Sequence, residues 1–328
     1  MADHVADEED YDGDIFIYRG GRAPRYIDHA RIDKSLDEIE DYAFCDCEYL
    51  IQVDTHDGLR KIGKDAFRYC RYLPQINLKS VVEIDSYAFD GCENLADVEF
   101  GDRLETIRNS AFRKCALKHL KLPTIINIGA AFRACTYLSD IELSERLQAI
   151  GVHAFNRCDR LKRIAMPLKR DLFVFDSIWE SYTQFFGCDQ LTIVDIVGAE
   201  GIHKTVASLH MESWRTEMIA EINRINQVLP TTPADGKTFE IRQWMHSVLD
   251  KMDHYKAEHN RYVKEGITLL ELALWKAKLG EQEETSVDSA EGKTKKAKVD
   301  AESTRKRKRI TCGADMVIKN VLPFLQLD

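Results

Sequence analysis

Short alternations of apolar and polar residues recur along the chain from residue 36 to residue 198. Each copy begins with Leu and places Val, Ile or Leu three residues later, and most copies add a third apolar residue two positions beyond. The copies begin at Leu50, Leu73, Leu95, Leu117, Leu138, Leu161 and Leu191. Alternation with period two predicts a short strand that has these apolar residues on one face and the intervening residues on the other.

An Ala-Phe pair, with Cys three residues after the Phe, precedes each of these strand signatures. The Phe and Cys residues are Phe44 and Cys47, Phe67 and Cys70, Phe89 and Cys92, Phe112 and Cys115, Phe132 and Cys135, Phe155 and Cys158, and, with Gln184 in place of Ala, Phe185 and Cys188. The five steps from Phe44 to Phe155 cover 111 residues, a mean of 22.2. One such repeat cannot bury its apolar face alone, whereas stacked repeats form a continuous core. We therefore predict an α/β solenoid with parallel strands.

The repeat unit L-x-x-I-x-L…I-x-x-x-A-F-x-x-C resembles the BspA-type leucine-rich repeat. The whole chain is similar to a family of microalgal intracellular proteins that pair this array with a helical C-terminal region. The start Tyr18-Arg19-Gly20-Gly21 and residues 224–230 and 269–279 carry that second resemblance. It implies a right-handed leucine-rich-repeat array of about seven repeats over residues 15–200. It also implies recognition by protein contacts, without shared catalytic residues.

The period changes after residue 200, and apolar residues then recur every three to five positions, as in amphipathic helices. We predict a helix from His203 to Pro230, a turn at Asp235-Gly236, and a second helix that ends at Leu279. Two helices joined by a short turn form an antiparallel hairpin or coiled coil over residues 203–279. The hairpin is expected to cap the solenoid, or else to form an oligomer with another chain.

Charge is concentrated at the two ends of a chain whose formal net charge is −9. Residues 1–14 contain seven acids and no Lys or Arg, and we predict an acidic disordered segment there. Residues 280–311 are predicted to be a basic disordered linker, because large apolar residues are almost missing from them. An apolar segment over residues 312–328 follows, which we expect to dock onto the hairpin or to serve as a short binding motif.

The sequence favours an intracellular protein of the nucleus or cytoplasm that does not associate with a membrane. The first residues are acidic, whereas a secretory signal begins with basic residues and an apolar run. No stretch approaches the roughly 18 apolar residues that a membrane helix needs. The nine Cys are an odd number at regular intervals, which is typical of reduced thiols rather than of a disulfide framework.

Three patterns that could indicate chemistry have structural explanations. The repeated Cys and Phe are typical of a buried column, and the spacing Cys45-x-Cys47 is too short for a zinc site. His254 and His259 lie about 140° apart around a helix, so they cannot easily share a metal. The chain has no glycine-rich phosphate loop and no G-x-S-x-G motif. We expect no catalytic residues, no metal and no cofactor.

The solvent-facing strand positions are the predicted binding surface. Six acids occupy these positions, against two residues with a permanent positive charge, Lys121 and Arg163. This balance favours a protein or peptide with basic residues as the partner and disfavours nucleic acid. The predicted site residues are Asp97, Glu99, His119, Lys121, Asp140, Glu142 and Arg163. The alternative that these positions form a generic solvated face remains open at this point.

The sequence thus predicts a non-enzymatic adaptor or scaffold that recognises protein through the strand face. The alternative is a nucleus-associated protein that binds nucleic acid or chromatin through its basic tail. Removal of residues 293–309, which carry a net charge of +7, would abolish such binding.

We predict that five consecutive basic residues are a nuclear localisation signal. They are Arg305, Lys306, Arg307, Lys308 and Arg309. A fluorescent reporter fused to the tail should enter the nucleus and should lose that distribution when all five are changed to Ala. An unchanged distribution would show that the run is only a solvated linker.

Overall fold

The structure is a computed structural model that describes residues 11–178, 182–209 and 211–287, with no side-chain description for residue 11 or for residues 277–287. The chain divides into two compact units. One contains the solenoid up to His203 together with Thr216–Lys251, and the other contains Lys204–Arg215 and the chain from Met252 onward.

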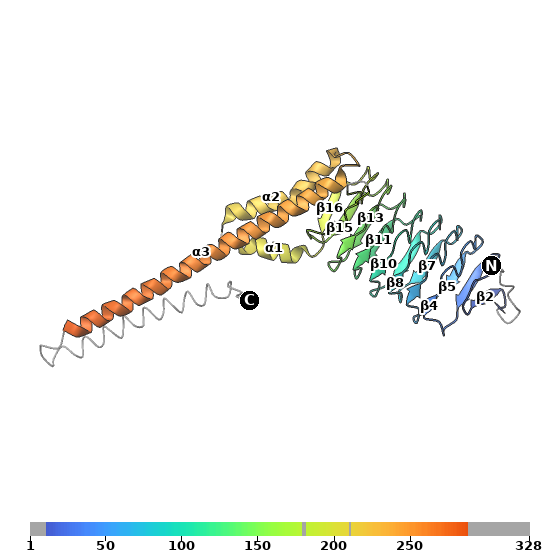
Figure 1. Ribbon diagram of the computed structural model, residues 1–328, viewed down its shortest axis with the longest axis horizontal. Helices are drawn as coiled ribbons and strands as arrows, with labels where there is room; N and C mark the ends of the chain where they lie inside the picture. The colour runs from blue at the N-terminus through green and yellow to red at the C-terminus, as the bar shows by residue number, and fades with distance from the viewer. Residues whose placement is uncertain (1–10, 179–181, 210, 288–328) are drawn as a thin grey trace. The chain divides into compact units, whose positions relative to one another are not determined.

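Parallel strands stack in chain order along the solenoid, so the predicted fold is confirmed (Figure 1). The longer strands are β2 (Ile15–Tyr18), β3 (His29–Ile32), β5 (Gln52–Asp54), β7 (Gln75–Leu78), β9 (Asp97–Phe100), β11 (His119–Leu122), β13 (Asp140–Leu143), β15 (Arg163–Met166) and β16 (Ile193–Ile196). They form three ladders, β2-β3-β5, β7-β9 and β11-β13-β15-β16, and β1 (Tyr11–Asp12) adds an antiparallel strand before β2.

A second parallel sheet runs along another side of the same rungs. Its six strands contain two residues each: β4 (Glu38–Ile39), β6 (Lys61–Ile62), β8 (Glu83–Ile84), β10 (Thr106–Ile107), β12 (Asn127–Ile128) and β14 (Ala149–Ile150). The second residue of each strand is a buried Ile, whereas the first residue is partly or largely exposed to solvent. The Ile that stands three or four residues before each Ala-Phe pair therefore lies in this short-strand sheet.

The Phe residues form one continuous column through the core. All seven rings are fully buried, and neighbouring rings stack with centroids 5.0–5.8 Å apart and planes within 8° of parallel. Tyr18 begins the column, with its ring centroid 4.9 Å from that of Phe44. The prediction that these Phe residues form a buried column is confirmed.

The Cys residues form a second buried column, and each thiol has a hydrogen-bond acceptor in the preceding rung. The Cys92 thiol donates to the Phe67 carbonyl at 3.0 Å, and the Cys135 thiol donates to the Phe112 carbonyl at 3.0 Å. Five further thiols, from Cys47 to Cys188, make the equivalent bond at 3.1–3.5 Å. Burial raises the pKa of Cys135 to about 12, so the column is neutral at physiological pH.

Helices cover the last rung of the solenoid and satisfy backbone groups that another rung would otherwise pair. Asn226 of α2 (Glu212–Val228) accepts from the Val194 amide at 2.8 Å, and Thr238 of α3 (Lys237–Val287) accepts from the Phe185 amide at 3.0 Å. The buried Lys237 ammonium donates to the carbonyls of Asp189 and Leu191 at 2.8 and 2.6 Å. These side chains close the exposed end of the sheet, which is what a terminal cap requires.

The helical region differs from the prediction in its boundaries. The helix expected from His203 is two helices, α1 (Ala199–Ser208) and α2, and the 3₁₀ turn η2 (Leu229–Thr231) follows α2. The Ser208 hydroxyl donates to the Thr205 carbonyl at 2.7 Å, and serine competes in this way with helical hydrogen bonds. α3 continues past Gly280, where a linker was expected, because the residues that follow the glycine are good helix formers.

Helices α2 and α3 run antiparallel, as the hairpin prediction requires. The Trp244 indole donates to the Glu221 carbonyl at 2.9 Å in the first unit, and in the second the Trp214 ring stacks on Tyr255 with centroids 5.1 Å apart. None of the helices in the described ranges combines the length and apolar character needed to span a membrane.

Several predictions fall on residues outside the described ranges. They concern most of the acidic segment 1–14, most of the linker 280–311, the basic run 305–309 and the apolar segment 312–328. Oligomer formation through the helical region also stays a prediction.

The thiol column predicts a loss of stability at alkaline pH. The folded-state pKa of Cys135 is above the thiol's ordinary value, so its contribution is fully present below about pH 8.5 and is lost as pH rises toward 12. Each such thiol should add up to ~1.4 kcal/mol per pH unit to the decline in the free energy of unfolding. Urea unfolding of the reduced protein between pH 8.5 and 10.5 measures this slope.

Cys135→Ser is the matched variant, because serine keeps a donor for the Phe112 carbonyl and does not titrate in this range. Its slope should be shallower by ~1.4 kcal/mol per pH unit. Equal slopes for the two proteins would contradict the claim that the buried Cys135 thiol contributes to the loss of stability at alkaline pH.

Candidate binding surface

The outward positions of the long strands form register rows on neighbouring rungs. His119, Asp140 and Arg163 lie opposite one another in one row of β11, β13 and β15. Lys121 and Glu142 begin the second row. The structure therefore brings five of the seven predicted site residues together on three adjacent strands.

The other two predicted residues belong to a different ladder. Asp97 and Glu99 lie on β9, which pairs with β7 opposite Gln75 and Asn77. Two further outward positions on β15 and β16 also differ in kind. Ala165 is buried, although its place in the alternation predicts exposure, and Ile193 is the exposed apolar residue of the first row.

Ion pairs between neighbouring rungs neutralise most of the acids on this face. The Arg163 guanidinium lies 2.6 Å from the Asp195 carboxylate and 3.2 Å from that of Asp140. Partial burial lowers the pKa of Arg163, but the bond to Asp195 and the two carboxylate charges outweigh that effect and raise it. The Lys121 ammonium lies 3.1 Å from the Glu142 carboxylate.

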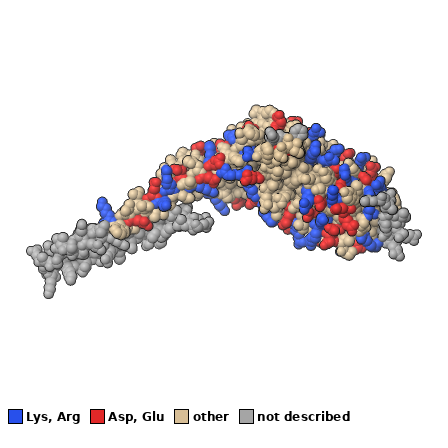
Figure 2. Space-filling model, in the orientation of Figure 1, with Lys and Arg blue, Asp and Glu red and all other residues tan. Residues whose placement is uncertain are grey.

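The same pairing extends toward the N-terminal rungs. Glu99 pairs with Lys79 at 2.8 Å, and Asp54 pairs with His29 at 3.0 Å and with Arg31 at 3.6 Å. Among the described residues, Asp97 is the one acid of the six predicted that makes no ion pair. Counting acids along the sequence therefore overestimates the negative field of the face. Figure 2 shows acidic and basic side chains intermixed over the solenoid.

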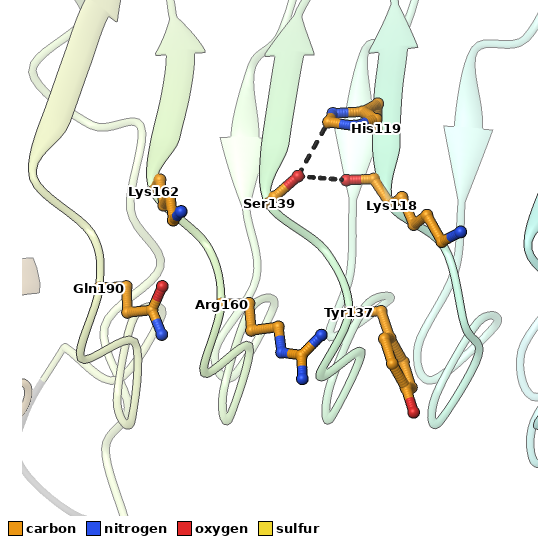
Figure 3. A pocket seen from close by; sticks show the side chains of 7 residues that line it. All are labelled: Lys118, His119, Tyr137, Ser139, Arg160, Lys162 and Gln190. Carbon is orange, nitrogen blue, oxygen red and sulfur yellow. Dashed lines mark hydrogen bonds between the residues drawn. The ribbon is translucent and has the colours of Figure 1, made fainter.

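A shallow groove of about 400 Å³ lies beside the rows, where the turns lead into β11, β13, β15 and β16 (Figure 3). Its lining residues are Lys118, His119, Tyr137, Ser139, Arg160, Lys162 and Gln190. Tyr137, Arg160 and Gln190 follow one another on successive turns, and Lys118, Ser139 and Lys162 stand at the strand starts. Of these seven residues, only His119 is among the site residues predicted from the sequence.

Contacts within the groove fix the positions of the Arg160 and Ser139 side chains. The Arg160 guanidinium lies over the Tyr137 ring, 5.0 Å from the ring centroid. The Ser139 hydroxyl donates to the Lys118 carbonyl at 3.1 Å and lies 3.3 Å from Nδ1 of His119. A groove with these side chains can bind anionic or hydrogen-bonding groups.

Exposed tyrosines occupy the same turn position in other rungs. Tyr26, Tyr49, Tyr72 and Tyr137 are 66, 63, 56 and 48% exposed. Each directly precedes the apolar residue that begins a strand signature, and Arg160 and Gln190 hold the equivalent position in the last two rungs. Aligning the repeats column by column would have revealed this position, because it is polar or aromatic in every rung except that of Ala116, beside a column of buried residues.

Metal ligation has no evident place in this surface. Within the described stretches, no three His, Cys, Asp or Glu side chains are grouped to hold an ion. The seven thiols of the column already donate to backbone carbonyls, and burial holds them in the protonated form that does not bind metals.

Comparison with solved structures finds bacterial leucine-rich-repeat proteins. A leucine-rich repeat protein from Bacteroides ovatus is 24% identical, with a TM-score of 0.41, over 54% of this chain and 48% of that one. The T. pallidum leucine-rich repeat protein is 23% identical, with a TM-score of 0.33, over 60% and 88% of the two chains. The pneumococcal vaccine antigen PcpA is 18% identical, with a TM-score of 0.30, over 55% and 65%.

The chain thus spans about half the length of the Bacteroides ovatus protein. No curated protein matches the chain. The similarity to microalgal proteins is not tested by these comparisons and stays a prediction.

The model of the BspA type leucine rich repeat region matches the chain in six copies. The matched segments are residues 25–130, 68–172 and 121–204, which together cover more than half of the chain. They coincide with the stacked rungs and their Phe and Cys columns. The chain belongs to the BspA-type leucine-rich repeat family.

Proposed function

We propose that this chain is a non-enzymatic protein-recognition module, an adaptor or scaffold, that binds its partner through the long-strand face. The observation that carries the proposal is the pair of register rows on β11, β13 and β15. These rows hold five side chains at fixed register positions on strands that cover a packed core: His119, Lys121, Asp140, Glu142 and Arg163. Repeat arrays of this kind present extended surfaces for protein contacts.

Catalysis has less support than recognition. The groove contains a Ser139–His119 contact, but the serine hydroxyl donates its proton to the Lys118 carbonyl. No carboxylate among the described contacts orients His119, whereas a nucleophile and its base need such a third group. The groove is also shallow, with exposed cations, unlike the enclosed pockets of most enzymes.

The ion pairs of the face favour a specific partner over general charge attraction. Exposed pairs contribute little to stability, so exchanging them costs the fold little. A partner that fits the order of charges along the rows would meet like charges if that order were reversed, and such contacts weaken binding strongly.

A charge exchange within one ion pair tests the proposal. Lys121→Glu combined with Glu142→Lys keeps the pair, the net charge and the register contact, but it reverses the order of charge on the face. The thermal midpoint should change by less than ~2 °C, whereas affinity for partners captured by the wild-type chain should fall at least ~10-fold. Quantitative pull-down followed by titration of the recovered partner measures both effects.

The matched control is the same exchange on the short-strand sheet. Glu38 and Lys61 also face each other across adjacent parallel strands, with their charges 3.5 Å apart. Glu38→Lys with Lys61→Glu should leave partner binding unchanged. Equal loss in both variants, or in neither, would show that recognition does not use the long-strand face.

A further inference from the structure

The groove beside the strand rows carries cations that the protein leaves unpaired. Lys118, Arg160 and Lys162 are exposed, and no described residue forms an ion pair with any of them. Lys121, three residues after Lys118, and Arg163, directly after Lys162, are both paired. One groove thus holds three cations without an ion pair to a described residue, on a chain with a net charge of −9.

The cations are spread along the groove rather than gathered around one point. Lys118, Arg160 and Lys162 come from the turns that lead into strands two rungs apart, with the rung of Tyr137 and Ser139 between them (Figure 3). Rungs repeat at about 4.8 Å, so the backbone positions of Lys118 and Lys162 are roughly 10 Å apart. An extended peptide rises about 3.3 Å per residue and therefore spans this distance in about three residues. A single phosphate would instead need cations that converge on one place.

The middle of the groove is suited to a peptide backbone and to apolar parts of side chains. The Tyr137 ring lies beneath the Arg160 guanidinium and restricts its movement, so less conformational entropy is lost on binding. Tyrosine also offers a large, rigid apolar surface with a polar tip. Gln190, at the last rung of the groove, provides an amide that can both donate and accept.

Neighbouring acids disfavour nucleic acid as the occupant. Asp159 and Asp189 are exposed and directly precede Arg160 and Gln190 in sequence. Asp140 begins the strand that follows Ser139. A continuous phosphate chain would meet these carboxylates as well as the cations, whereas a peptide with a few spaced carboxylates can avoid them.

We infer that this groove binds an acidic segment of the partner protein in an extended conformation, with its carboxylates on Lys118, Arg160 and Lys162. The inference rests on the proposed function, because it specifies the chemistry of the partner. It also differs from the expectation of a basic partner, which depended on acids that the structure shows to be paired.

The probe is a fluorescein-labelled ten-residue peptide of alternating Glu and Ser, with an alternating Gln and Ser peptide as its neutral match. Binding is measured by fluorescence anisotropy on the full chain at 50 and 200 mM salt. Every protein carries Ala at positions 305–309, so that the basic tail contributes less to the signal. Lys118→Gln with Arg160→Gln and Lys162→Gln should weaken binding of the Glu peptide at least ~10-fold, because two or three ion contacts are lost.

The control variant is Lys34→Gln with Lys64→Gln and Arg103→Gln. These exposed cations lie on other turns, and their removal lowers the net charge by the same amount. The affinity of the control variant for the Glu peptide should be within about twofold of that of the parent protein. The neutral peptide should bind to none of the proteins. Equal affinity of the groove variant and the control variant would overturn the inference.

A ten-nucleotide thymidine strand is the third probe. Tighter binding of this strand than of the Glu peptide, with loss in the groove variant, would show that the groove serves nucleic acid and would also overturn the inference. If the groove variant binds the peptide normally while the Lys121–Glu142 exchange still loses the native partner, this inference fails and the proposed function stands.

Discussion

Ring-on-ring stacking of the Phe column is the constraint on which the rest of this structure depends. Successive rings lie 5.0–5.8 Å apart and nearly parallel, so each rung sits directly over the one before. The thiol-to-carbonyl bonds of the Cys column tie the same rungs together. Because the register cannot slip, residues at equivalent repeat positions form straight rows on the surface. The proposed binding surface is thus a consequence of the way the core is packed.

Periodicity in the sequence predicts the core and the outward strand positions, but not the partners of the charged residues. Spacing alone indicates that Arg163 faces outward, yet its bridge to both Asp140 and Asp195 depends on the stacking of three particular rungs. Asp90 is a clearer failure. No pattern in the sequence indicates that it is fully buried, where the Arg113 guanidinium of the next rung binds it at 2.6 and 2.8 Å. Such pairs form between residues more than 20 positions apart, beyond the reach of a local pattern.

The candidate surface has two parts that differ in electrostatics: strand rows whose charges are mostly paired, and a groove with cations that form no ion pair among the described residues. On the strand rows, ion pairs already satisfy most charges, so a partner must match their order and gains specificity rather than attraction. In the turn groove, Lys118, Arg160 and Lys162 form no ion pair with any described residue, and under the inference above their positive field would attract an acidic segment from a distance. The exposed tyrosines along the same edge add rigid aromatic area, which is typical of residues that dominate binding energy at interfaces. Under the proposed function, recognition and attraction would use adjacent parts of the long-strand side of the solenoid.

Site-specific photo-crosslinking tests the central claim, that recognition uses the long-strand side of the solenoid, most directly. Benzoylphenylalanine would replace His119, an exposed residue of β11 at the groove, or Asn127, an exposed residue of β12 on the short-strand sheet of the same rung. After irradiation with cell extract, we expect position 119 to form a covalent adduct with the partner recovered by the wild-type chain and position 127 to form none. Adducts with that partner from position 127 and none from position 119 would contradict it.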